Sequence, residues 1–210
     1  MAAEIYTFPA TMSMKTAGST DERSEARTDG VPKAVDEAVR SVRRMTLRDD
    51  LEYREIPVPA SLADYGIGVE MTTGEHVDAA VSGWIMVLYA RQARPEWASH
   101  WRCVAFASWA LGPENHNSLT PSLYWADVER LLTGRRLGSL IGTVSVNHNT
   151  RFPSAPDEGR ASASVGCEAR ASWTPASETG ILDAGRQIDM WARFLSSLMD
   201  NEEGTDSFRD

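Results

Sequence analysis

The sequence ASASVGCEARASWTP, Ala161 to Pro175, alternates strictly between two sets of residues. In a β-strand successive side chains point to opposite faces, so this alternation predicts a long strand with one buried face. Most of the apolar set is small, which leaves room for bulky helix side chains to approach closely. The apolar set comprises Ala161, Ala163, Val165, Cys167, Ala169, Ala171 and Trp173.

The rest of the chain contains four further strand patterns and three helical ones. The strands are expected at Tyr65–Met71, Val81–Ala90, Trp101–Leu111 and Leu140–His148. Apolar residues recur at helical spacing between Val31 and Met45, from Thr120 to Gly134 and from Ile188 to Met199. Three consecutive strands with short links favour antiparallel pairing. We therefore expect an α+β fold with a mainly antiparallel five-stranded sheet packed by helices, in the order α-β-β-β-α-β-β-α. This order resembles that of the type III secretion chaperone-like fold.

Length and composition indicate a single domain with two tails. The 210 residues suit one α+β domain at residues 30–200. Residues 1–29 have no apolar periodicity and residues 201–210 are mostly polar or acidic, so both are expected to be disordered. The start of the chain has no secretory pattern, and the longest uncharged apolar run, Ala79–Ala90, is too short to span a bilayer. We expect a cytoplasmic protein without a membrane partner.

The charge pattern bears on possible partners. A net charge of -9 argues against broad binding to nucleic acid, although Arg40, Arg43 and Arg44 form a local basic patch on the first helix. Solvated helix charges are the plainer interpretation of that patch. Cys103 and Cys167 lie inside strand patterns without metal-ligand spacing, so they are expected to be reduced, buried thiols.

No catalytic motif is present, and His76, His100, His116 and His148 have no metal-binding spacing. We therefore expect no catalytic residue, no metal and no cofactor. The candidate binding residues are Arg102, Glu168, Arg170 and Trp173. Glu168 and Arg170 share a strand face, which fits a structural salt bridge with each other or with Arg102, or alternatively a ligand-recognising cluster. Trp84, Trp109 and Trp173 either fill the core or line an aromatic pocket.

Four segments, EIPVPASLADY, WRCVAFA, GTVSV and especially EARASWTP, resemble the bacterial family called Domain of Unknown Function 3000. The resemblance covers roughly residues 35–200. The chain departs from the family pattern at Tyr89–Arg91, in place of His-Asp-Pro, and at RFPSAP, in place of a glycine-rich turn. The resemblance implies one compact domain in a bacterial cytoplasm and no mechanism. The positions it implies as matching are Glu55, Pro57, Pro59, Arg102, Gly142, Thr143, Glu168, Arg170, Ser172, Trp173 and Pro175.

Three functional hypotheses follow. The first is a binding or adaptor domain without catalysis, which either self-associates as a homodimer or binds another protein. Both faces of the apolar strand Val81–Ala90 need to be covered, and the helices are expected to cover only one of them. The second is an enzyme whose site combines Arg102, Glu168 and loop histidines. The third is an accessory role in nucleic-acid metabolism through Arg40, Arg43 and Arg44.

Overall fold

The computed structural model describes residues 4–5, 30–73, 81–112, 119–133, 138–151 and 162–203. Most of the two predicted tails, residues 6–29 and 204–210, lies outside these ranges. The helices are α1 (Lys33–Arg44), α2 (Thr120–Thr133) and α3 (Ala184–Glu203). The strands are β1 (Glu4–Ile5), β2 (Glu52–Glu55), β3 (Tyr65–Thr72), β4 (Ser82–Arg94), β5 (Ser99–Leu111), β6 (Gly138–Arg151) and β7 (Ser162–Thr174).

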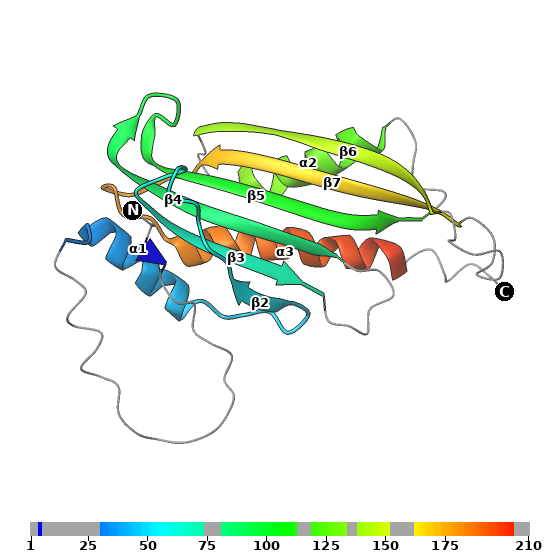
Figure 1. Ribbon diagram of the computed structural model, residues 1–210, viewed down its shortest axis with the longest axis horizontal. Helices are drawn as coiled ribbons and strands as arrows, with labels where there is room; N and C mark the ends of the chain where they lie inside the picture. Colours follow the sequence, from blue (N-terminus) through cyan, green and yellow to red (C-terminus); the bar gives the residue numbers. More distant parts are fainter. Residues whose placement is uncertain are drawn as a thin grey trace, which may run out of the picture.

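The strands form one open sheet in the order β1-β3-β4-β5-β7-β6 (Figure 1). β1 pairs in parallel with Tyr65 and Gly66, whereas β2 pairs antiparallel with Val69–Thr72. These two short strands therefore share one edge of β3. All other pairs are antiparallel, which confirms the α+β class.

The predicted count of five strands was wrong, because the sheet is six strands wide among the described residues. All five predicted strands are present. The additional position is filled by β1, which has two residues, and β2, which has four. Segments this short do not carry enough alternation to be recognised in a sequence. Their pairing is instead supplied by the free edge of β3.

All three helices pack against the same face of the sheet (Figure 1). α3 crosses β4 and β5, α2 lies over β6, and α1 packs against α3. The sheet face beneath them is lined by small residues, and Ala105, Ala107, Ala169 and Ala171 are each at most 2% exposed. The rings of Trp191 and Phe194, on α3, are buried above this face. The expected packing of bulky side chains onto a small-residue strand is therefore confirmed.

Both cysteines are free and buried, as expected, and we predict slow reaction with thiol reagents. Burial raises the pKa of Cys103 above its ordinary range and raises that of Cys167 to about 12, so few thiolates are present at neutral pH. The measurement is labelling with a maleimide, without denaturant and with a denatured control. Rapid labelling of either cysteine in the native protein would contradict this prediction.

Candidate functional site

Arg102, predicted to bind a ligand or partner, is a buried residue that joins three strands. Its Nε donates to Ser172 Oγ at 2.8 Å, and its Nη1 donates to Thr174 Oγ1 and to the Ser139 carbonyl, both at 3.1 Å. Burial lowers the pKa of Arg102, and no carboxylate pairs with it in the described part of the chain. Ser139 has a φ of 40°, in an irregular stretch of β6, so Arg102 satisfies a backbone carbonyl that leaves the regular ladder.

Two of the three strand tryptophans belong to the core. Trp173 is fully buried on β7 and donates from Nε1 to Gln187 Oε1 at 2.9 Å. Trp109 packs edge-on against Tyr124 of α2, with ring centroids 4.7 Å apart. Trp84, in contrast, points to the opposite face of the sheet, which no helix covers in the described residues. The assignment of Trp173 as a binding residue stays a prediction, and in this conformation its ring is enclosed.

Glu168 and Arg170 form the expected ion pair on that outer face. Arg170 Nη2 lies 2.8 Å from Glu168 Oε2, and the two side chains are 57% and 30% exposed. The Arg170 guanidinium also lies over the ring of Phe106, 5.2 Å from its centroid. Arg102 does not take part, because it bonds Ser172 and Thr174, which lie about 13–20 Å along β7 from Glu168 at strand spacing.

The Glu168–Arg170 pair is predicted to contribute only about 0–1 kcal/mol to stability, because both side chains remain in contact with water. A double-mutant cycle with Glu168→Gln and Arg170→Met, read by denaturant unfolding, measures this coupling. If either variant instead abolishes a binding activity while stability is unchanged, the pair has a functional role and the structural interpretation fails.

Four partly buried apolar side chains form a square on the outer face, which we call the outer patch. Two of them, Met86 and Val104, also pack against a second buried cluster, made of Val58, Ala63, Leu88, Ala90 and Trp97. Trp84 pairs with Phe106 across β4 and β5, and Met86 pairs with Val104 in the same register. The rings of Trp84 and Phe106 are stacked with centroids 5.9 Å apart. The patch lies between two ion pairs, Arg54–Glu70 on one side and Glu168–Arg170 on the other. Sequence reasoning found the apolar strand but not this square, which depends on the strand register.

The residues proposed for an enzyme site do not meet. His100 lies beside Ala90, with Nδ1 2.8 Å from its carbonyl, and His148 is on β6. Arg102, on β5, bonds Thr174 near the end of β7, whereas Glu168 lies near the middle of β7. His76 and His116 lie outside the described residues. No group of metal-ligating side chains occurs within the part of the chain that is described.

The predicted basic patch on α1 is partly neutralised. Arg40 pairs with Asp36 at 2.7 Å and with Glu37 at 3.4 Å. Arg43 and Arg44 remain without an ion pair among the described residues. They stabilise the carboxyl end of α1, where cations interact favourably with the helix dipole.

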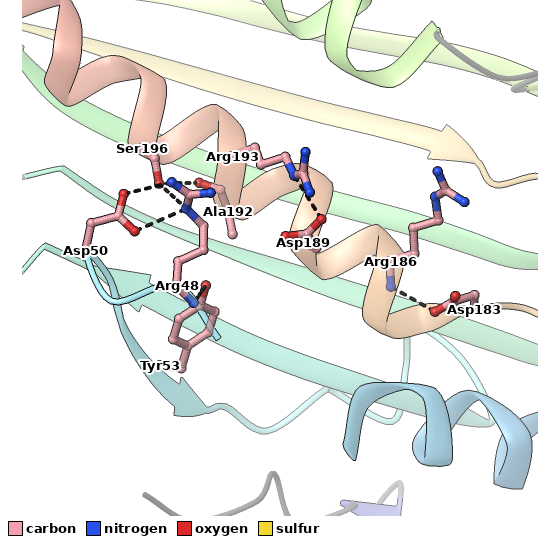
Figure 2. Close-up of polar contacts among 9 residues, drawn as sticks. All are labelled: Arg48, Asp50, Tyr53, Asp183, Arg186, Asp189, Ala192, Arg193 and Ser196. Carbon is pink, nitrogen blue, oxygen red and sulfur yellow. Dashed lines mark hydrogen bonds and ion pairs between the residues drawn. The ribbon is translucent and has the colours of Figure 1, made fainter. Parts of the chain in front are cut away.

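A polar cluster anchors the segment after α1 to α3 (Figure 2). Arg48 Nε donates to Asp50 Oδ1 at 3.1 Å and to Ser196 Oγ at 2.7 Å. Burial, the largest single influence, raises the pKa of Asp50, but hydrogen bonds with Ser196 and Arg48 outweigh it and leave that pKa below its ordinary value. The Asp50 carboxylate therefore favours the folded state.

Asp50→Asn is predicted to destabilise the protein at pH 7. Because the folded pKa of Asp50 is lowered from 3.8, its contribution is present above that value and is lost as the pH falls through the folded pKa. Urea unfolding of the wild type and of Asp50→Asn should therefore show a difference in the free energy of unfolding that becomes smaller below about pH 4. Asp49→Asn removes the same charge one residue earlier and serves as the control. A difference that is independent of pH, or equal in the control, would contradict the prediction.

The fold defines a class of protein: an antiparallel α+β domain with helices on one sheet face and an apolar patch on the other. Residues 31–200 match the family described as "Protein of unknown function (DUF3000)", so the chain belongs to this family. The family suggested by the sequence motifs is thereby confirmed. No curated protein and no solved structure matches the chain. Within the described residues, no helix combines the length and apolar character needed to cross a membrane.

Proposed function

We propose that this protein is a binding domain without catalytic activity, and that its outer patch is the binding surface. The observation that supports this is the one-sided arrangement of α1, α2 and α3, which leaves Trp84, Met86, Val104 and Phe106 only partly buried on the other face. Aromatic residues, methionine and arginine are enriched in protein interfaces, and an apolar centre with a polar rim is their usual anatomy. The outer patch has this composition, with Arg170 and Glu168 at its rim.

A second copy of the chain is the partner that the charges favour. With a net charge of -9, two copies repel each other, so association requires a locally neutral surface. The outer patch is such a surface, because each of its flanking arginines is matched by a glutamate. In a two-fold symmetric dimer the same patch meets itself, and Glu168 of one copy can face Arg170 of the other.

The test is the oligomeric state of the full chain, measured by analytical ultracentrifugation over a range of concentrations. We expect a reversible dimer for the wild type. Phe106→Ser and Trp84→Ser should each weaken it by about 30-fold, the effect of losing about 2 kcal/mol at a central interface residue. Leu123→Ser is the matched control, since Leu123 is 63% exposed on α2, over the opposite face of the sheet.

Two results would reject the proposal. A wild-type chain that remains monomeric at about 100 µM would exclude a functional dimer at cellular concentrations. If Leu123→Ser weakened the dimer equally, association would be nonspecific hydrophobic aggregation that does not depend on the outer patch. Circular dichroism of each variant shows whether the fold is intact.

Two further features belong to this proposal. The likeness in element order to the type III secretion chaperone-like fold concerns the fold alone. We also propose a bacterial, cytoplasmic setting. Two free, buried cysteines suit its reducing conditions.

A further inference from the structure

Besides the outer patch, the surface has a groove between α1 and α3 that is large enough to hold a small molecule. It has a volume of about 460 Å³ and lies where the end of α1 meets the first turns of α3. An adjoining hollow of about 450 Å³ shares Asp183 and Arg186 with it. Both volumes fall in the range of about 300–1,000 Å³ typical of small-molecule sites. We call the first the arginine groove and the second the apolar hollow.

Three arginines contribute to the walls of the arginine groove, and two of them have no partner among the described residues. Arg193 is paired with Asp189 at 2.9 Å. Arg44 and Arg186 make no side-chain hydrogen bond or ion pair with any described residue. In Figure 2 the side chain of Arg186 extends away from Asp183. The dashed line between the two residues starts at the Arg186 backbone nitrogen, and no dashed line reaches the guanidinium group.

Two carboxylates also line the groove, and only that of Asp189 is paired with an arginine. Asp183 Oδ1 accepts a hydrogen bond from the backbone N–H of Arg186 at 2.9 Å, which holds it at the start of α3. Asp189 Oδ2 is held by Arg193. Arg44 and Arg186 thus come from different helices and line one cavity, in which the arginines outnumber the aspartates by one. This local positive charge contrasts with the net charge of -9 for the whole chain.

The apolar hollow has a different character. Ile181, which is 42% exposed, and Met190 give it apolar surface, while Glu178, Thr179 and Gln187 add polar groups to its lining. Because Arg186 borders both cavities, a ligand held by that arginine could extend an apolar group into the hollow. The pair of cavities thus offers an anion site joined to an apolar site.

We propose that these cavities bind a small molecule that carries a phosphoryl group on an apolar body. A phosphate monoester has a charge of about -1.5 to -2 at neutral pH and three acceptor oxygens, so it can accept hydrogen bonds from two arginines on different helices at once. Guanidinium groups also form forked hydrogen bonds to phosphate oxygens. The phosphoryl group occupies the arginine groove between Arg44 and Arg186, and the apolar body occupies the hollow beside Ile181. This site is separate from the outer patch and does not depend on it.

The experiment is calorimetric titration of the full chain with three probes: phenyl phosphate, inorganic phosphate and benzoate. We expect phenyl phosphate to bind with a Kd of about 1 mM or tighter, as its size allows. Inorganic phosphate should bind more weakly because it cannot fill the hollow, and benzoate should be weakest because it lacks the second charge. Ile181→Ser should reduce the preference for phenyl phosphate over inorganic phosphate.

Matched arginine variants distinguish a site from general electrostatics. Arg44→Met and Arg186→Met should each weaken phenyl phosphate binding by at least about 10-fold, as expected for losing a hydrogen-bonded ion contact. Arg43→Met removes the same charge from the same helix, but Arg43 does not line the groove, so binding should be unchanged. Thermal unfolding of every variant verifies that each is folded.

Three results would overturn the proposal. The first is no binding of either phosphate probe, and the second is equal loss of affinity in Arg43→Met and Arg44→Met. The third is binding of an acidic peptide that phenyl phosphate does not displace, which would assign the groove to a protein partner.

Discussion

Trp191→Ala is expected to lower the free energy of unfolding by about 3–5 kcal/mol, the range for truncating a buried tryptophan. Trp191 is 1% exposed and lies on α3 above the small-residue face of the sheet. Its ring contacts Phe194 with centroids 4.9 Å apart, and its Nε1 donates to the Phe106 carbonyl at 3.1 Å. Alanines on the sheet side cannot fill the space that the ring leaves, so a cavity remains.

Denaturant titration measures this loss, and two further variants identify its cause. Trp191→Phe keeps an aromatic ring but removes the N–H donor and part of the indole volume, so its smaller cost reports the hydrogen bond to Phe106 and the lost packing together. His148→Ala, at an exposed position on β6, should change stability by no more than about 0.5 kcal/mol. A loss below about 1 kcal/mol for Trp191→Ala would mean that α3 does not depend on this packing.

The main strands and the buried face could be predicted because they follow from local periodicity. The alternation in β7 correctly placed Cys167, Ala169, Ala171 and Trp173 on one buried face. The same logic correctly paired Glu168 with Arg170, since residues two apart on a strand share a face. What these features have in common is that each is decided within a few residues of chain.

Features that depend on how distant elements meet could not be predicted in this way. Arg102 looked like a partner for Glu168, but the register of β5 and β7 places it beside Ser172 and Thr174 instead. The outer patch requires the exact register of β4 against β5. The arginine groove requires α1 and α3, which are far apart in sequence, to pack together. No local sequence pattern predicts which distant helices and strands will come into contact.

Gly185→Ala is expected to lower the free energy of unfolding, by about 1–3 kcal/mol, although alanine is the better helix former. Gly185 is in the first turn of α3, and its backbone N–H donates to Ser41 Oγ of α1 at 3.1 Å. An added Cβ would lie only 2.5 Å from the Ser41 carbonyl oxygen and 3.3 Å from the Cβ of Met45. These atoms are fixed parts of α1, so the two helices would have to separate.

The sign of the change in the free energy of unfolding distinguishes close helix packing from loose packing. In an uncrowded helix the same substitution would stabilise the protein by about 1 kcal/mol, so only close contact between the helices can make it destabilising. Gly166→Ala on β7 is the control, because a Cβ there would lie 3.7 Å from its nearest neighbour, an ordinary contact. Denaturant unfolding of both variants is the measurement. If Gly185→Ala is more stable than the wild type, α1 and α3 do not pack as closely as described, and the groove between them lacks a fixed shape.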